Sequence, residues 1–182
     1  FEGLLTDNGN NTAAMGGIIG FNYVGSNSFQ NIYQNIVDSS NVNNLSVSGG
    51  DYTGGIIGNN DIDDAAKVDV YENAVAGDIN ATNSGTGGIA GQIRVRGYYN
   101  NPEFVVENNY FSGDINANGD QTGGLTGVIN VSNDQLAESS TSTVTISKNY
   151  SIGAVIAGGS SAGGLIGLIN PVNNSNTFVN LL

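Results

Sequence analysis

Thr53-Gly-Gly-Ile-Ile-Gly58 and Thr86-Gly-Gly-Ile-Ala-Gly91 are two copies of the phrase that decides the fold of this 182-residue chain. The phrase occurs five times, beginning at residues 15, 53, 86, 122 and 162, with spacings of 33 to 40 residues. Such a period indicates one structural unit stacked on copies of itself. We therefore expect a single domain with units at about 1–14 (partial), 15–52, 53–85, 86–121, 122–161 and 162–182 (partial), as a slice of a longer array.

A second element leads to an asparagine in each complete unit and continues to a small residue four places further on. Two examples are Val70-Tyr-Glu-Asn73 and Val106-Glu-Asn-Asn109. The polar residues before each asparagine predict a bend, and a short amide at a bend can cap backbone groups and pair with its copies above and below. We therefore predict a structural ladder formed by Asn35, Asn73, Asn109 and Asn149.

The apolar positions of the two elements predict short strands, because a strand alternates its faces with a period of two. Three strands per unit, each paired with its copy one unit along, make a parallel β-solenoid (β-helix) of roughly triangular section, with right-handed winding. The variable position of the phrase (Ile57 in the second phrase) is expected to face outward. The inward core column consists of Ile18, Ile56, Ile89, Leu125 and Leu165.

Composition excludes several classes of protein. The net charge is −12 and the only basic residues are Lys67, Arg94, Arg96 and Lys148, which argues against nucleic acid or an anionic membrane as a partner. No run of about 18 apolar residues is present, so we expect no membrane insertion. The absence of cysteine excludes disulfides and thiolate metal sites, and we expect no cofactor apart from a weakly held Ca²⁺.

The two elements together, Gly-Gly-Ile/Leu-x-Gly and then Asn-x-x-x-Gly-Asp-Ile, resemble the GLUG motif. That repeat occurs in large bacterial surface proteins, namely filamentous haemagglutinin-like adhesins and some surface-attached immunoglobulin A proteases. The resemblance runs from about Met15 to Leu168, and the chain departs from it at Ser39, in place of the glycine, and at Ala154, in place of the aspartate. It implies a secreted, surface-displayed solenoid segment without a catalytic centre in the repeats.

Two groups of acidic residues are candidate Ca²⁺ ligands, because hard cations favour clustered oxygen ligands. Asp61, Asp63 and Asp64 lie in one acidic insertion, and the alternative is a solvated loop. Asp78 and Asp114 occupy equivalent positions in neighbouring units, so stacking would bring their carboxylates within about 5 Å of one another. Such a pair suits Ca²⁺ or a retaining glycosidase, and the alternative is two solvated turn residues.

Tyrosines are candidate glycan contacts, because the ring presents an apolar face with a polar tip. Tyr110 and Tyr150 fall in one column directly after the ladder asparagines. Tyr98 and Tyr99 lie on an insertion in the unit at 86–121. The alternative is that these rings pack beneath the insertion loops.

These observations favour a non-catalytic structural and adhesive module at the extracellular surface of a bacterium. Its expected partners are proteins or glycans of a host or neighbouring cell. A carbohydrate-active β-helix enzyme is the first alternative, although the chain lacks histidine. The second alternative is a self-assembling fibre subunit, because the open ends of a solenoid are unpaired edges that invite end-to-end self-association.

Overall fold

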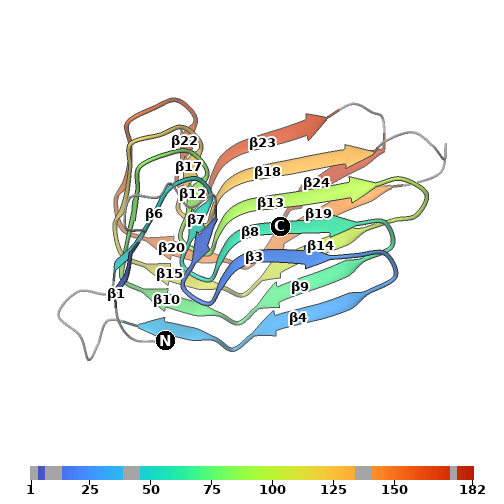
Figure 1. The fold of residues 1–182 in the computed structure, drawn as a ribbon, viewed down its shortest axis with the longest axis horizontal. Coiled ribbons are helices and arrows are strands. Elements are labelled where there is room, and N and C mark those ends of the chain that lie inside the picture. The colour runs from blue at the N-terminus through green and yellow to red at the C-terminus, as the bar shows by residue number, and fades with distance from the viewer. Residues whose placement is uncertain (1–3, 7–13, 39–45, 134–140, 173–175) are drawn as a thin grey trace.

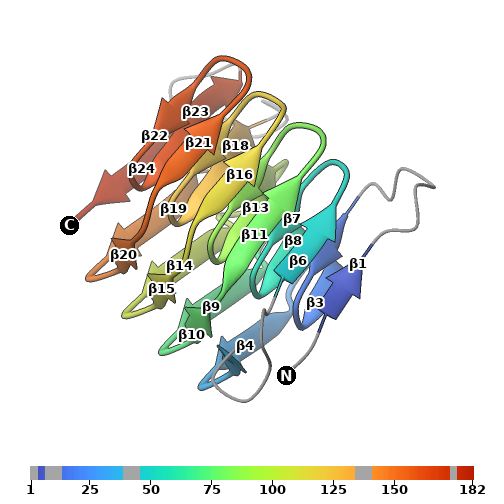
Figure 2. The ribbon, with the colours of Figure 1, turned by 90° about the vertical axis from the view of Figure 1, so that its left-hand side faces the viewer.

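The computed structural model describes residues 4–6, 14–38, 46–133, 141–172 and 176–182. The described residues form 24 strands and no helix, wound into a parallel β-solenoid of about four turns. Figures 1 and 2 show the coils stacked along one axis, with the long strands on two opposite sides. Because the described part of the chain contains no helix, it contains no helical segment that could cross a membrane.

Five sheets run along the solenoid, and every strand pair between coils is parallel. Each full coil visits the sheets in the order A, B, C, D and E. Sheet A contains β1 (Leu4–Thr6), β6 (Ser46–Gly49), β11 (Asp78–Ala81), β16 (Ile115–Ala117) and β21 (Val155–Ala157). Sheet B contains β2 (Met15–Gly16), β7 (Thr53–Gly54), β12 (Thr86–Gly87), β17 (Thr122–Gly123) and β22 (Ala162–Gly163).

The remaining three sheets complete each coil. Sheet C contains β3 (Ile19–Val24), β8 (Ile57–Asp63), β13 (Ala90–Gly97), β18 (Thr126–Asn133) and β23 (Ile166–Val172). Sheet D contains β4 (Phe29–Tyr33), β9 (Lys67–Tyr71), β14 (Glu103–Glu107), β19 (Ser142–Ser147) and β24 (Thr177–Leu181). Sheet E contains β5 (Ile36–Asp38), β10 (Ala74–Ala76), β15 (Tyr110–Ser112) and β20 (Tyr150–Ile152).

The predicted core column is present and its members are joined by backbone hydrogen bonds. The N–H of Ile56 donates to the carbonyl of Ile89, and the N–H of Ile89 donates to that of Leu125, at 3.0 and 2.9 Å. These three side chains are buried. Ile18 and Leu165, at the two ends of the column, are 40% and 46% exposed because no coil covers them. Like residues therefore lie over like residues from coil to coil.

The outward position predicted for Ile57 is wrong, and so is the prediction of three strands per unit. The N–H groups of Ile56 and Ile57 both donate to Ile89 O, while Gly54 pairs with Gly87 and Ile57 with Ala90, so successive coils bend at the same place and stay in register. This bend interrupts the alternation of faces, and both isoleucines are completely buried. It also separates sheet B from sheet C, and a second bend separates sheet D from sheet E, so that each full coil has five strands.

The glycines of the repeated phrase allow backbones to touch where sheet B packs against the start of sheet C. A Cβ at Gly54 would lie 2.7 Å from Gly91 N, and one at Gly91 would lie 2.6 Å from Thr53 N. The middle glycine faces the core, where a Cβ at Gly88 would lie 2.6 Å from a ring carbon of Phe111. In the phrase copies that begin at residues 53, 86 and 122, all three glycine positions exclude a side chain, which accounts for the repeated glycines.

The asparagine ladder forms at the bend between sheets D and E. Asn73 donates from both its backbone N and its Nδ2 to Asn109 Oδ1, at 3.0 and 2.9 Å. Asn35 and Asn109 donate in the same way to the next asparagine along, which for Asn109 is Asn149. The residue before each asparagine has a left-handed backbone conformation; Glu72, for example, has a φ of 56°. The corner at Ser39 lies outside the described residues.

Candidate functional site

A groove of about 500 Å³ with a largely polar lining runs over the outer face of sheet C. Gln92, Arg94 and Arg96 alternate along β13 and form its floor, because alternate residues of a strand share one face. Tyr98 follows the end of β13, and Tyr52 stands at the opposite end. We call this surface the β13 groove, and its walls are completed by Asn59 of β8 and by Asn130 and Ser132 of β18.

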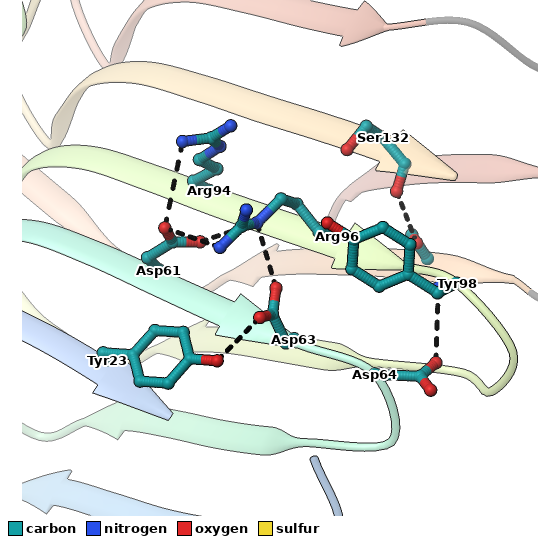
Figure 3. A network of polar contacts seen from close by, with 9 residues as sticks. Tyr23, Asp61, Asp63, Asp64, Arg94, Arg96, Tyr98 and Ser132 are labelled. Carbon is teal, nitrogen blue, oxygen red and sulfur yellow. Dashed lines mark hydrogen bonds and ion pairs between the residues drawn. The ribbon is translucent and has the colours of Figure 1, made fainter. Parts of the chain in front are cut away.

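An ion-pair network fixes the floor of the β13 groove (Figure 3). Arg96 donates from Nε and Nη2 to the two carboxylate oxygens of Asp61, at 3.2 and 3.0 Å, and its Nε lies 2.9 Å from Asp63 Oδ1. Arg94 lies 3.8 Å from Asp61 Oδ2, and 48% of its side chain is exposed. Tyr23 O–H donates to Asp63 Oδ2 at 2.8 Å. Arg96 is thus held rigidly, whereas the guanidinium of Arg94 faces solvent.

Burial and neighbouring charges act in opposite directions on the network. Burial raises the pKa of Asp61, and the guanidinium groups of Arg96 and Arg94 only partly offset that effect. Burial lowers the pKa of Arg96, but the carboxylates of Asp61 and Asp63 outweigh it and the pKa is raised. The two arginines and these two aspartates balance in charge, so the groove is close to neutral in a chain whose net charge is −12.

Asp64 organises the turn that carries Tyr98. Its Oδ1 accepts backbone N–H groups from Tyr98, Tyr99 and Asn100 at 3.3, 2.8 and 2.6 Å. Burial tends to raise the pKa of Asp64, but these three donors outweigh burial and lower it. Because three successive backbone groups bind one carboxylate, the turn between β13 and β14 is fixed, and with it the tyrosine end of the groove.

The structure does not support the predicted Ca²⁺ site in the acidic insertion. Asp61 and Asp63 bind arginine, and Asp64 binds backbone N–H groups, so the three carboxylates serve separate partners. Within the described ranges, no group of three or more His, Cys, Asp or Glu residues is arranged to hold a metal ion. The alternative interpretation, a solvated loop, does not describe Asp61 and Asp64, which are both buried.

Asp78 and Asp114 lie one coil apart, as the repeat predicts, but each carboxylate serves the backbone of the next coil. Asp78 Oδ1 accepts the N–H of Asp114, and Asp114 Oδ1 accepts the N–H of Ala154, both at 2.9 Å. Both side chains are exposed. This arrangement is a second capping ladder, and it accounts for the two aspartates without a metal ion or a reaction.

The four candidate tyrosines do not form one surface. Tyr110 and Tyr150 stack with their centroids 5.9 Å apart on sheet E, whereas Tyr98 and Tyr99 lie at the turn after β13. Of the four, Tyr98 alone lines the β13 groove. Sequence reasoning missed a second stack, Tyr33 on Tyr71 at 5.1 Å, although their equivalent places before the ladder asparagines were a usable signal.

Sequence reasoning also missed most of the groove. Of its floor residues, Arg94 and Arg96 were recognised only as rare basic residues and Gln92 was not recognised at all, although their alternation along one strand could have placed them on a common face. Tyr52 could not have been placed there, because its position depends on the left-handed corner before sheet B, where its φ is 49°.

No family model, curated protein or solved structure matches this chain.

Proposed function

We propose that this chain is a non-catalytic structural and adhesive module of a bacterial surface protein, and that the β13 groove binds an uncharged oligosaccharide on a host or neighbouring cell. The groove itself is the observation that carries the proposal. From Gln92 to Tyr98 the groove covers six residue steps, or about 20 Å, at the rise of a strand. Such a length suits a short oligosaccharide lying along β13.

The side chains of the groove match the chemistry of sugars. Amides and guanidinium groups are planar and can bind neighbouring hydroxyls through two hydrogen bonds, and the groove offers Gln92, Asn59, Asn130 and Arg94. Tyr52 and Tyr98 supply apolar ring faces at its two ends. Because the arginines are balanced by aspartates, the groove favours an uncharged ligand over an anionic one.

A rigid support makes the groove useful for adhesion. The floor belongs to a sheet whose strands are paired in register on both sides, so binding would order little of the backbone. The repeated coils and the resemblance to GLUG repeats favour display outside the cell. A carbohydrate-active enzyme is not favoured, because Asp78 and Asp114 already cap backbone groups and the groove acids are paired with arginine.

A glycan array followed by calorimetry tests this proposal. We expect a neutral oligosaccharide to bind and to be recovered intact. Tyr98→Ala and Gln92→Ala should each weaken binding about 10-fold, equivalent to about 1.4 kcal/mol. Tyr110→Ala, on sheet E, is the matched control and should leave affinity unchanged. Affinity should also change little between low and physiological salt, because the ligand is uncharged.

Three results would overturn the proposal. The first is the absence of any neutral glycan among the ligands. The second is loss of binding in Tyr110→Ala together with full binding in Tyr98→Ala, which would move the site to the tyrosine stack. The third is release of reducing ends that Asp114→Asn abolishes, which would favour the enzyme.

A further inference from the structure

Two pairs of tyrosines stack ring on ring between neighbouring coils. The ring centroids of Tyr33 and Tyr71 lie 5.1 Å apart, and their planes are inclined by 5°. The centroids of Tyr110 and Tyr150 lie 5.9 Å apart, with planes inclined by 14°. Both separations are within the range of direct contact between aromatic rings. Half of the eight tyrosines of the chain are therefore held in pairs.

The register of the coils produces both contacts. Tyr33 pairs with Tyr71 across β4 and β9, so the two backbones lie about 4.8 Å apart and the rings share one face of sheet D. Tyr110 pairs with Tyr150 in the same way across β15 and β20, which lie side by side in Figure 2. We call these contacts the Tyr33–Tyr71 stack and the Tyr110–Tyr150 stack.

Each stack stops at two rings and is open to solvent from the side of the solenoid. On its other side Tyr71 pairs with Glu107, and Tyr110 pairs with Ala74. Tyr110 has a coil on both sides and its side chain is still 38% exposed. Tyr71, which also lies between two coils, is half-buried. A small soluble reagent can therefore reach both stacks, and each ring has one stacked partner.

The backbone that carries the rings is fixed by the asparagine ladder. Tyr71 is the second residue before Asn73, and Tyr110 is the first residue after Asn109. These asparagines are joined from coil to coil by hydrogen bonds at 3.0 and 2.9 Å. Two reactive groups that are already held in contact react with each other in preference to groups that must meet by diffusion.

We propose that the two stacks are oxidative cross-linking sites, at which one-electron oxidation joins each pair of rings as dityrosine. Each phenol gives up one electron and its O–H proton, and the two phenoxyl radicals form a bond between ring carbons that neighbour the oxygen-bearing carbons. The hydrogens on those two carbons then move to the oxygens, which restores both phenols. Hydrogen peroxide with a haem peroxidase supplies the oxidant: each link removes two hydrogen atoms from the protein and reduces one peroxide to two waters.

The links join β4 to β9 and β15 to β20 covalently. The chain has no cysteine, so disulfides cannot join its coils. Each link closes a loop of about 40 residues and so restricts the unfolded chain in the way that a disulfide does. We expect each link to raise the urea midpoint of unfolding by about 1–2 M.

Tryptic digestion tests the proposal directly, because it separates the partners of each stack. Cleavage after lysine and arginine leaves each stacked tyrosine on a different peptide, namely 1–67, 68–94, 97–148 and 149–182. Dilute protein is treated with a haem peroxidase and hydrogen peroxide, then unfolded and digested. Mass spectrometry should find the first peptide joined to the second and the third joined to the fourth, each product lighter by two hydrogen atoms than the sum of its parts.

Conservative variants assign the links to individual rings. Tyr71 and Tyr150 are the only tyrosines of their peptides. Tyr71→Phe and Tyr150→Phe keep an aromatic ring but lack the phenol, so each variant should lose its own link and retain the other. Tyr99→Phe removes a tyrosine that is 60% exposed and belongs to neither stack, and it should leave the yield of both links unchanged.

Two results would overturn the proposal. The first is oxidation of Tyr99 without either link, under conditions that convert free tyrosine to dityrosine. The second is a yield of links between the second and third peptides, or between chains, as high as that of the stacked pairs, because ring contact would then not select the partner. Circular dichroism verifies that the strands remain intact during oxidation. Glycan binding is measured on unoxidised protein, so failure here leaves the groove proposal standing.

Discussion

Asn109 is the side chain whose replacement tests the ladder most severely. It is 1% exposed, and its Oδ1 accepts both the backbone N–H and the side-chain amide of Asn73. Its Nδ2 donates to Val70 O and to Asn149 Oδ1, both at 2.9 Å. Asn109→Ala leaves the two donors of Asn73 without this acceptor. A buried unpaired group costs about 1–3 kcal/mol, so we expect the free energy of unfolding to fall by about 3 kcal/mol.

Asn109→Asp is a more specific test of the ladder, because the aspartate side chain has nearly the same shape as asparagine and only its charge and hydrogen-bonding groups differ. The carboxylate still accepts from Asn73, but its second oxygen faces Val70 O and Asn149 Oδ1, which are both acceptors. A buried charge facing two acceptors is strongly unfavourable, so this variant should be less stable than Asn109→Ala at pH 7. Protonation supplies one donor and removes the charge, so the difference between the two variants should shrink as the pH approaches 4.

Urea unfolding followed by circular dichroism measures both effects. With an m-value of about 2 kcal/mol/M, a loss of 3 kcal/mol lowers the midpoint by about 1.5 M. Asn116→Asp, an exposed asparagine of β16 in the same coil, is the matched control and should change stability by less than about 0.5 kcal/mol. Finding Asn109→Ala within that margin, or the Asp variant as stable as the Ala variant at pH 7, would refute the reasoning.

Three further changes probe the packing and the groove. Gly88→Ala should cost about 3 kcal/mol in urea unfolding because its Cβ would overlap the ring of Phe111, and a loss under about 1 kcal/mol would contradict the close contact. Thr86→Val should be neutral or stabilising because its buried hydroxyl has no partner among the described residues. Thr53→Val should be the less stable of the two variants because it removes a hydrogen bond to a backbone carbonyl. Thermal melts that rank the two variants in the opposite order would argue against this. The pKa of Asp64 is lowered in the folded state, so its carboxylate stabilises the fold above the unfolded pKa of about 3.9, and this stabilisation is lost as the pH falls toward the folded pKa. The difference in unfolding free energy between the wild type and Asp64→Asn should therefore narrow from about pH 5 to about pH 2.5. A difference that stays constant over this range would exclude the effect.

The sequence was sufficient to predict the architecture because its signals repeat. The spacing of the glycine phrase predicted parallel stacking, and the asparagine at a fixed place in each unit predicted the ladder. The burial of Ile57 was not predictable from alternation, because a bend inside the repeated phrase interrupts the period of two. The repeat predicts which residues pair between neighbouring coils. It does not predict where inside a coil the alternation of inward and outward side chains is interrupted.

The groove was harder to predict because it belongs to no single repeat. Gln92, Arg94 and Arg96 occur in one coil, and their counterparts on β18 are Val128, Asn130 and Ser132. A site built from positions that differ between units leaves no periodic signal. Asp61 pairs with an arginine of the next coil, and this pairing likewise depends on the register between β8 and β13. The acidic insertion read alone therefore suggested a metal ion where the structure has an arginine side chain.

Disulfide formation between neighbouring coils tests the register of the stack most directly. The chain has no native cysteine, and Ala76 pairs with Ser112 across β10 and β15. Neighbouring parallel strands lie about 4.8 Å apart, within the range that a disulfide spans. Ala76→Cys with Ser112→Cys should therefore oxidise fully to an intramolecular disulfide, whereas Ala74→Cys with Ser112→Cys, about 8 Å apart, should remain reduced. Equal oxidation of both pairs, or oxidation of the second pair alone, would contradict the stacking of equivalent residues.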